Sequence, residues 1–525
     1  MNRHFTAERL EKIRKVLLVL ILLVYPTVLS FSFTGEIFPL DDGPELVFVR
    51  GMDSKWNVFG PDVFGLFRPV KNILFLLFAN IFGFGFKWCR LVGLVVGILS
   101  FFPVLALARR VLANEWKAIL AASIWLLSPT LVSSVVWLSC LNIQIMATFA
   151  ALSIICHDSA WDSATFRSGR IALAGLFLFL ALVSYESAVS VLPIVLLFDF
   201  ILRPGRCASG KALRAYSWYV CIFAVYLILR HANHSSTGLD GNFDNIVRWQ
   251  IMVSSPFFVA EHFISWFWPF GRMAVVASYK WGMVSAWFIV LDACILAVAG
   301  ILALLFRRNS PVICFCILFS LVAIAPVSNC LGFGNGPYGD YYLTLVSIGL
   351  SMGCVGLCSL LLEKQGRFRL VALLLVVLFV ASRIAAVPIT AHWAFLWGRG
   401  VEAHEASIQS FPSSFSNKIM LAHLLFDRNR REEAMTWCDS AESDVSPDSK
   451  WMATIHLLRA MYALVVSHDA DLALDLLEKS DHATEAQSKG VNNRHYYRGC
   501  VFEDLKNDEA TAEREYELAL VGNWN

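Results

Sequence analysis

Long apolar runs, separated by short polar segments, fill the first three quarters of the chain. Most of these runs come close to the ~20 residues that a helix needs to cross the hydrocarbon core of a bilayer. The first run follows a basic segment and has no small-residue cleavage site, which indicates an uncleaved first helix. The pattern predicts an all-α, polytopic transmembrane helix bundle with about eleven spanning helices: Val16–Phe33, Leu91–Ala108, Ala118–Val132, Asn142–Cys156, Ile171–Ser184, Ala188–Leu202, Tyr216–Leu229, Ser285–Phe306, Pro311–Ser328, Tyr342–Leu362 and Leu370–Pro388.

Two further apolar runs are expected to lie at the membrane surface, or to re-enter it without crossing. Ile73–Phe86 is short and is interrupted by two glycines, and Ile251–Phe270 is interrupted by Pro256 and Pro269. The second run is also rich in tryptophan, which favours the headgroup level. Counting either run as a span would scatter the basic clusters over both faces of the membrane.

Lysine and arginine clusters between the apolar runs set the expected orientation. Cytoplasmic loops carry an excess of these residues, and six clusters share one face if eleven helices span. We therefore expect a multi-pass protein of a bacterial inner membrane, with a cytoplasmic N-terminus and an extracytoplasmic C-terminus. The clusters are Arg9–Lys15, Arg109–Lys117, Arg167–Arg170, Arg203–Arg214, Arg307–Arg308 and Lys364–Arg369. The outer loops would be Thr34–Asn72, Arg230–Arg248, Gly271–Gly282 and Asn329–Tyr341.

Composition and charge point to two bodies of different kinds. Hydrophobic residues make up 57% of the chain and charged residues 16%, whereas a soluble protein is nearer half apolar and a quarter charged. This balance excludes a soluble enzyme, a disordered chain and a nucleic-acid binder. Residues 399–525 hold 13 basic and 22 acidic side chains, a net charge of −9, and residues 1–398 have a net charge of +11. We expect a transmembrane domain over 1–398, with a first outer loop at 34–72, and a water-soluble domain over 399–525 on the outer side.

Small residues recur in the soluble tail where paired helices would cross. Ala434, Ala473 and Ala512 are 39 residues apart each time, a longer period than the ~34 residues of a tetratricopeptide (TPR) repeat. The pattern predicts three helical hairpins in a small TPR-like α-solenoid, near the minimum for a stacked core. Such an array either docks a protein or peptide, or forms a rigid lid or dimerisation surface, and the pattern favours neither.

The cysteine pattern gives no sign of a metal centre. Most of the 13 cysteines lie inside apolar runs and lack zinc-type spacing, so they are better interpreted as small buried side chains. We expect no metal or cofactor, although a divalent metal stays open.

An acidic pair, Asp41 and Asp42, follows the first expected helix by a few residues, at the outer face of the membrane. A carboxylate at that place can take a proton from an acceptor hydroxyl, and its neighbour can position the acceptor. The alternative is a solvated pair in an ordinary turn.

Charged residues beside the other apolar runs are further candidates. Arg68, with Lys71 close behind it, can neutralise a lipid phosphate at the bilayer surface, or can serve only as a juxtamembrane anchor. Glu186 opens an apolar helix, where an ionisable group is costly and indicates function, unless it only complements the helix N-terminus. Asp199, further along the same run, is expected to pair with Arg203.

A cluster of polar aromatic residues precedes the tenth expected span. Tyr338, Asp340 and Tyr342 lie on the expected outer face, where hydroxyl and carboxyl groups can contact sugar or phosphate. The alternative is an aromatic belt at the headgroup level.

Taken in order, the motifs are similar to those of a known family. After the acidic pair come FRPV, YESAVSVLPIVLLFDF, YLILR, WPFGRMAVVASY, YGDYYLTLVSIG and an exit into the repeats. This succession resembles the polytopic GT-C glycosyltransferases with C-terminal TPR repeats, the group of the transmembrane-and-TPR O-mannosyltransferases and their bacterial relatives. Two positions depart from the family pattern. Tyr185 replaces a lysine, and Asp340-Tyr341-Tyr342 replaces Glu-Arg-Tyr, so that an arginine is missing.

The resemblance implies an inverting transfer of a sugar from a polyprenyl-phosphate donor to an acceptor hydroxyl on the extracytoplasmic face. Asp41 would be the general base, and Asp42 would hold the loop or the acceptor. The partners would be the lipid-linked donor, a protein or glycan acceptor, membrane lipids and a protein at the repeats. A weak or inactive relative, a non-catalytic TPR membrane scaffold and a lipid or glycan transporter are the alternatives. The expected donor-binding residues are Arg68, Lys71, Glu186, Arg230, Arg272, Tyr338, Asp340 and Tyr342.

Overall fold

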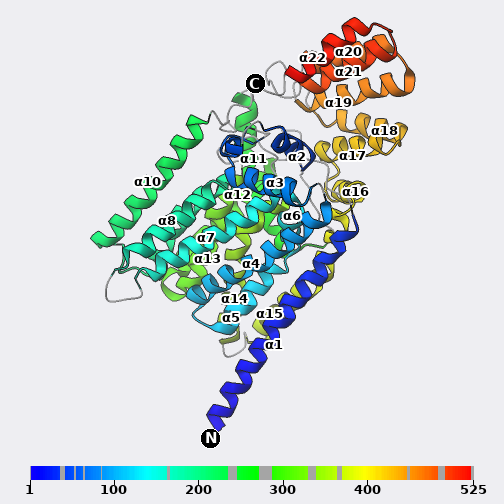
Figure 1. Ribbon diagram of the computed structural model, residues 1–525. Coiled ribbons are helices and arrows are strands. Elements are labelled where there is room, and N and C mark those ends of the chain that lie inside the picture. The colour runs from blue at the N-terminus through cyan, green and yellow to red at the C-terminus, as the bar shows by residue number, and fades with distance from the viewer. Residues whose placement is uncertain are drawn as a thin grey trace. The chain divides into compact units, whose positions relative to one another are not determined.

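The computed structural model describes residues 2–35, 42–52, 55–62, 65–83, 85–161, 166–207, 209–233, 245–270, 286–328, 338–363, 369–445, 450–482 and 491–521. These residues form helices joined by turns, and no β-strand occurs among them (Figure 1). The all-α prediction is therefore confirmed. The chain divides into two compact units, the second of which consists mainly of residues 400–525.

In the first unit, seven helices of the described residues are long and apolar enough to cross a membrane. They are α1 (Asn2–Ser30), α4 (Phe86–Leu112), α7 (Leu141–Ser159), α10 (Gly210–Ala232), α12 (Ala286–Asn309), α14 (Leu343–Glu363) and α15 (Arg369–Trp397). A multi-pass membrane bundle is thus confirmed.

The remaining predicted spans are helical but short or broken. A bend of 57° separates α5 (Glu115–Leu126) from the segment Pro129–Val136, which comprises η3 (Pro129–Leu131) and α6 (Val132–Val136). The proline at the bend disfavours helix in the residue before it. The short apolar helices are α8 (Ser168–Leu182) and α13 (Pro311–Ile324), and the predicted span at Ala188–Leu202 is divided into η5 (Glu186–Ser190), α9 (Val191–Leu197) and the π-turn η6 (Phe198–Leu202). The count of eleven spans therefore stays a prediction.

The two runs that were expected not to span also form helices. Ile73–Phe86 falls mainly in α3 (Pro69–Ile81), followed by a turn before α4, and Ile251–Phe270 falls in α11 (Asn245–Phe267), which contains Pro256. The segment before α3 holds α2 (Asp42–Arg50) and η2 (Lys55–Phe59). Within its described residues, the segment 34–72, which is expected to be the first outer loop, is thus built largely from short helices.

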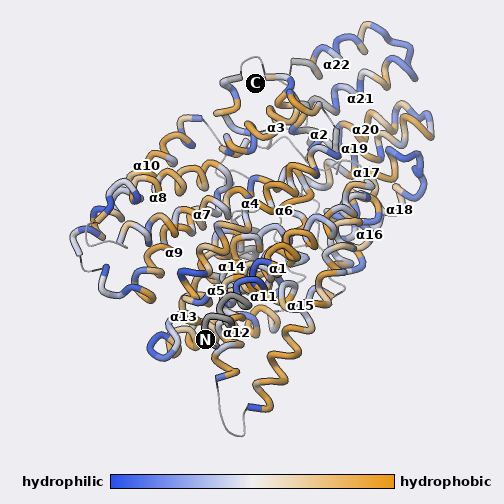
Figure 2. The backbone as a smooth tube through the Cα atoms, turned by 60° about the horizontal axis from the view of Figure 1, so that its bottom comes forward, coloured by the Kyte–Doolittle hydropathy of each residue, from blue (hydrophilic) through white to orange (hydrophobic). Residues whose placement is uncertain are grey.

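The outward side chains of the bundle are apolar. In the most apolar 18-residue stretch of α12, and likewise of α15, only 11% is buried inside the protein. Leu304 of α12 and Leu370 of α15 are among the exposed residues. Figure 2 shows these helices as almost continuously hydrophobic, whereas α16–α22 alternate between hydrophobic and hydrophilic positions. Such helices are typical of a lipid-facing surface.

Small residues allow the bundle helices to approach one another closely. A Cβ atom on Gly349 of α14 would lie 2.7 Å from the ring of Phe319 and 3.0 Å from the carbonyl of Cys316, both on α13. At Gly300 of α12 the same atom would meet nothing within 4 Å. The contact between α13 and α14 therefore depends on the missing side chain at Gly349.

A buried polar cluster joins α7, η6 and α10 near one end of the bundle. Asp199 lies 2.8 Å from the ring of His157, accepts a hydrogen bond from Tyr216 at 2.8 Å, and is 3.4 Å from Arg206. The expected pairing with Arg203 is wrong, because Asp199 is fully buried in the π-turn, while the partly exposed Arg203 side chain lies 3.5 Å from Asp158.

The second unit contains three helical hairpins after α16 (Gly400–Ser410). They are α17 (Phe415–Asp427) with α18 (Arg431–Glu442), α19 (Lys450–Tyr462, continued by the π-turn η9, Ala463–Ser467) with α20 (Ala470–His482), and α21 (Val491–Asp504) with α22 (Glu509–Val521).

Each hairpin repeats two structural details at the 39-residue period. Ala434, Ala473 and Ala512 are buried at the fourth position of the second helix. The turn before that helix carries a residue with positive φ in each case: Asn429, His468 and Asn507. The array is thus a true structural repeat, and its assignment to the TPR class stays a prediction.

The close approach at Gly349 generates a stability prediction. Gly349→Ala should lower the thermal midpoint of the detergent-solubilised protein, because overpacking costs about 1–3 kcal/mol. Gly300→Ala is the matched control, and it should leave the midpoint unchanged or raise it, since alanine favours a helix by about 0.5–1 kcal/mol over glycine. The midpoint is read by fluorescence-detected size exclusion after heating. Equal midpoints for the two variants would contradict the packing described for α13 and α14.

Candidate functional site

Asp42 is the first residue of α2, and its buried carboxylate fastens this helix to the bundle. It accepts hydrogen bonds from the backbone N–H of Ser139 at 2.9 Å and from the Ser139 hydroxyl at 2.6 Å. Ser139 lies in η4 (Leu138–Cys140), directly before α7. Burial raises the pKa of Asp42, and the two bonds from Ser139 oppose this rise. Asp42 therefore positions the loop.

Lys71 of α3 joins two carboxylates from the same outer loop. Its ammonium donates to Glu45 of α2 and, at 3.2 Å, to Asp62. The lysine side chain is 2% exposed and both acids are fully buried. Burial opposes the charge of Lys71, but Asp62 and Glu45 outweigh it and raise the pKa of the lysine. Burial and the Asp62 carboxylate raise the pKa of Glu45 to about 7, against the opposing effect of Lys71.

Arg68, immediately before α3, joins the outer loop to a distant part of the bundle. Its Nε lies 3.0–3.1 Å from both oxygens of Glu186, and Nη2 donates to Glu186 Oε2 at 2.9 Å. Nη1 lies 3.9 Å from Asp62. The guanidinium also lies 4.5 Å from the centre of the Tyr185 ring, an arrangement typical of cation–π attraction. Burial opposes the charge of Arg68, but Glu186, Tyr185 and Asp62 raise its pKa well above the usual value.

Arg230, at the end of α10, reaches this ion pair through a tyrosine. Its Nη1 donates to the hydroxyl of Tyr226 at 3.3 Å. Tyr226 packs its ring against Phe67, with 6.3 Å between the ring centres, and it lies close enough to Glu186 and Arg68 to interact with their charges. A single residue, Tyr226, thus lies between Arg230 and the Arg68–Glu186 pair.

Aromatic residues before α14 also lie close to the same pair. Tyr342 interacts through its side chain with Tyr341 and with Tyr185, the residue beneath the Arg68 guanidinium. The ring of Tyr338 packs at a tilt of 33° against His262 of α11, with 4.3 Å between ring centres. Asp340 is 1% exposed and begins η8 (Asp340–Tyr342).

The structure therefore brings several of the predicted site residues into one network. Glu186 pairs directly with Arg68, and Arg68 connects through Asp62 to Lys71. Tyr342 and Arg230 join through Tyr185 and Tyr226. Asp42 fastens the same loop through Ser139. Tyr338 and Asp340 are buried and lie close to Tyr342 in the sequence. Asp41 and Arg272 lie outside the described residues.

Five residues of this network were not predicted as site residues: Glu45, Asp62, Ser139, Tyr185 and Tyr226, the last of which was noted only as part of the YLILR motif. Glu45 and Asp62 are acids of the expected outer loop. Their position among short apolar segments, which folding buries, is the sequence feature that could have identified them. Tyr185 stood out only as a departure from the family pattern. Ser139 lies in an apolar run and carried no signal.

The network holds charges of both signs. Its acids are Asp42, Glu45, Asp62 and Glu186, and its bases are Arg68, Lys71 and Arg230, while Arg90 acts on Asp42 from a distance. Burial favours the protonated form of an acid, and it raises the pKa of both Asp42 and Glu45, the latter to about 7. Within the described residues, no group of three or more His, Cys, Asp or Glu is arranged to hold a metal ion.

The raised pKa of Glu45 generates a prediction on pH. The folded state holds a proton that the unfolded state releases between about pH 4.5 and pH 7, so the free energy of unfolding falls as the pH rises through this window, by at most ~1.4 kcal/mol per pH unit. Glu45→Gln keeps an acceptor for Lys71 and should flatten this decline. Thermal midpoints of the solubilised protein at pH 5 and pH 7 provide the measurement.

Glu509→Gln is the control, because Glu509 is an exposed residue of the second unit. That variant should keep the wild-type slope. A Glu45→Gln protein with the same slope as the wild type would show that Glu45 does not hold the proton.

Comparison with known proteins gives only distant matches. No protein-family model and no curated protein matches the chain. Among solved structures, ArnT from Cupriavidus metallidurans bound to undecaprenyl phosphate is similar at 13% identity, over 78% of this chain and 80% of that one, with a TM-score of 0.35. The same enzyme in the apo state matches at 14% identity over 77% and 80%, with a TM-score of 0.37. The apo oligosaccharyltransferase of Archaeoglobus fulgidus matches at 14% identity and a TM-score of 0.42, over 73% of this chain but only 56% of its own length. At these TM-scores the correspondence is loose.

Proposed function

We propose that the protein is a GT-C-type membrane glycosyltransferase that transfers a sugar from a polyprenyl phosphate to an acceptor hydroxyl on the extracytoplasmic face. The observation that carries the proposal is the Arg68–Glu186 ion pair, which joins FRPV to YESAVSVLP across 118 residues. YLILR and YGDYY reach the same pair through Tyr226 and Tyr342. Four motifs that are separate in the sequence thus meet around one arginine.

Arg68 is the proposed partner of the donor phosphate. Its guanidinium can bind two phosphate oxygens at once, and its side chain is 11% exposed, beside a Glu186 side chain that is 22% exposed. An arriving phosphate would compete with Glu186 for the N–H groups of Arg68. Arg230 would add a second positive charge near the phosphate. This charge would compensate for the arginine of the family pattern, which is replaced here by Tyr341.

The contact between Tyr185 and Arg68 suggests why a tyrosine replaces the lysine that the family pattern has at this position. Its ring lies under the Arg68 guanidinium, and a lysine at this position would instead repel the arginine. The ring can orient Arg68 without adding charge. Positive charge at the phosphate is needed because negative charge develops on the leaving group as its bond breaks.

The proposed reaction is a single in-line displacement. The acceptor oxygen forms a bond to the anomeric carbon while the bond from that carbon to the phosphate oxygen breaks, which inverts the anomeric configuration. The phosphate leaves with the bonding electron pair, and the hydroxyl proton goes to Asp41. The contact of Asp42 with Ser139 supports this division of labour, since the Asp42 carboxylate is already occupied in holding α2.

The helical repeats of the second unit are proposed to bind a protein acceptor or partner on the extracytoplasmic side. Their acidic character and hairpin arrangement suit such a surface, and the distribution of basic clusters supports this orientation.

A transfer assay with radiolabelled polyprenyl-phosphate sugars, on full-length protein in proteoliposomes, tests the proposal. Asp41→Asn should reduce transfer by about 10²–10⁴-fold, the usual loss of a general base, while donor binding persists. Asp42→Asn should reduce it by roughly 10–100-fold, as expected when a hydrogen bond to a charged group is weakened. Ser139→Ala removes one of the two bonds to Asp42 and should share this partial defect.

Asp53→Asn, another acid of the same outer loop, is the control and should transfer at the wild-type rate. A larger defect in Asp42→Asn than in Asp41→Asn would exchange the two roles. Wild-type transfer by all four variants would remove the acidic pair from the mechanism. No transfer by the wild type with any donor, despite donor binding, would favour the inactive scaffold.

A further inference from the structure

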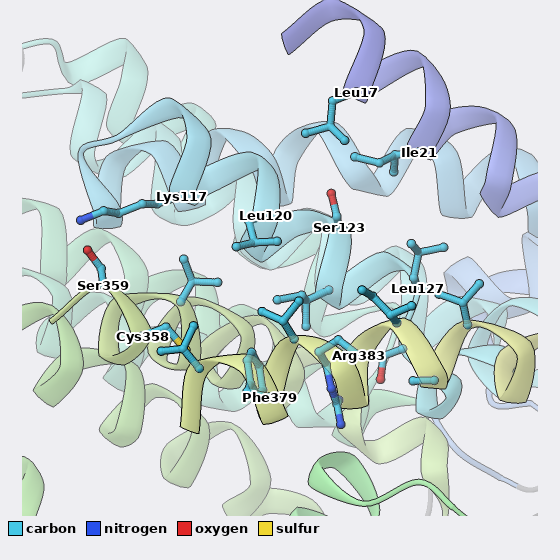
Figure 3. Close-up of a pocket in the computed structure, with 18 of the residues that line it drawn as sticks. Leu17, Ile21, Lys117, Leu120, Ser123, Leu127, Cys358, Ser359, Phe379 and Arg383 are labelled. Atoms are coloured by element: carbon cyan, nitrogen blue, oxygen red, sulfur yellow. The ribbon is translucent and has the colours of Figure 1, made fainter. Parts of the chain in front are cut away.

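Two adjoining cavities lie at the end of the bundle where α5 and α13 begin and where α12 and α14 end. The larger, of about 640 Å³, is lined by residues of α1, α5, α14 and α15 (Figure 3). The smaller, of about 240 Å³, is lined by the start of α13, the end of α14 and Leu112. Both include Lys117 and Ser359 in their walls, so the two spaces meet at these residues.

The larger cavity is an apolar groove that opens toward the surroundings of the bundle. Leu120, Val380 and Ile384 line it, and all three are exposed. Figure 3 shows Lys117 and Ser359 at one end and Arg383 further along the groove. The guanidinium of Arg383 is already engaged by the carbonyls of Trp266 and Phe267, at 2.9 and 2.7 Å. Lys117 is therefore the cation available to a ligand in the groove.

The smaller cavity provides polar groups that suit an anion. Lys117 makes no side-chain hydrogen bond or ion pair within the described part of the chain. Ser310 precedes α13, Pro311 has no N–H group, and the N–H of Val312 lies in the first turn, where a helix offers no internal acceptor. The helix N-terminus and the Lys117 ammonium both favour negative charge. Glu363 is the acidic residue in the wall, and its carboxylate accepts a hydrogen bond from Ser359 at 3.4 Å.

We propose that these cavities bind one anionic glycerophospholipid, with its phosphate at Lys117 and the N-terminus of α13 and its acyl chains in the apolar groove. Charge complementarity decides for an anionic headgroup, because Lys117 lines both cavities and the N-terminus of α13 lines the smaller one. Arg307 and Arg308 end α12 just before Ser310 in the sequence, but neither lines either cavity, and Arg307 lies against the ring of Phe200. These two arginines form one of the clusters that predict the cytoplasmic face, where anionic lipids attract basic residues.

This lipid site is distinct from the proposed donor site. Tyr342, beside the start of α14, belongs to the network around Arg68, while Glu363 ends the same helix and lines the smaller cavity. The 21 residues of α14 correspond to about 30 Å at 1.5 Å per residue. The lipid would fill the space between α1, α5, α14 and α15 and does not depend on any glycosyltransferase activity.

Native mass spectrometry of the full-length protein, titrated with dioleoylphosphatidylglycerol, tests the proposal. The wild type should bind one lipid molecule, and Lys117→Gln should weaken this binding about 10-fold or more, as expected for a lost charge-assisted hydrogen bond. Val380→Trp, which fills part of the groove, should weaken it as well. Lys211→Gln is the matched control, since Lys211 is an exposed lysine in the first turn of α10, outside both cavities, and should bind like the wild type.

Equal binding by the wild type and Lys117→Gln would overturn the proposal. Equal affinity for dioleoylphosphatidylethanolamine would overturn the choice of an anionic headgroup. Displacement of phosphatidylglycerol by an equimolar polyprenyl phosphate, sensitive to Lys117→Gln but not to Arg68→Gln, would assign the groove to the lipid donor instead.

Discussion

Arg68 and Glu186 form an ion pair between residues 118 positions apart, and both side chains are mostly shielded from water. Removing two charges from water is costly, and the loss is offset only when the geometry is good and the remaining donors are satisfied. Here three short contacts join the guanidinium to the carboxylate, Asp62 lies behind it, and the Tyr185 ring lies beneath it. The start of α3 is thereby fixed against the corner between α8 and η5, and Tyr226 and Tyr342 lie close to the same pair.

The Arg68–Glu186 pair also determines how the proposed site would bind a phosphate. Arg68 is oriented before any ligand arrives, so binding a phosphate would cost little rearrangement beyond the release of Glu186. Glu186 would then be free to accept hydrogen bonds from a sugar. The second group of charges, Glu45 with Lys71 and Asp62, is more deeply buried and supports the loop. Asp42 does the same through Ser139. The outer loop is thus held by its acids, which leaves Asp41 as the proposed base.

Much of the fold could be predicted because its signals are local. Apolar runs specify helices in a membrane, and the 39-residue recurrence of Ala434, Ala473 and Ala512 anticipated three hairpins whose turns repeat as well. Arg68 and Glu186 could be chosen as candidates since charges beside apolar runs are rare. Their pairing could not be predicted, nor could the partners Glu45, Asp62 and Ser139, because these contacts depend on how distant helices pack. The failed pairing of Asp199 with Arg203 has the same origin: sequence proximity suggested it, and a π-turn directed the carboxylate inward to His157 instead.

Binding of a polyprenyl phosphate to the full-length protein, compared among Arg68→Gln, Glu186→Gln and the wild type, tests most directly whether this ion pair is a phosphate site. If it is, Arg68→Gln should weaken binding by about 10-fold or more, and Glu186→Gln should strengthen it by removing the competing carboxylate. Arg109→Gln, which breaks an exposed ion pair with Glu115, should leave the affinity unchanged. Wild-type affinity in both Arg68→Gln and Glu186→Gln would show that the pair serves the fold alone and would contradict the account.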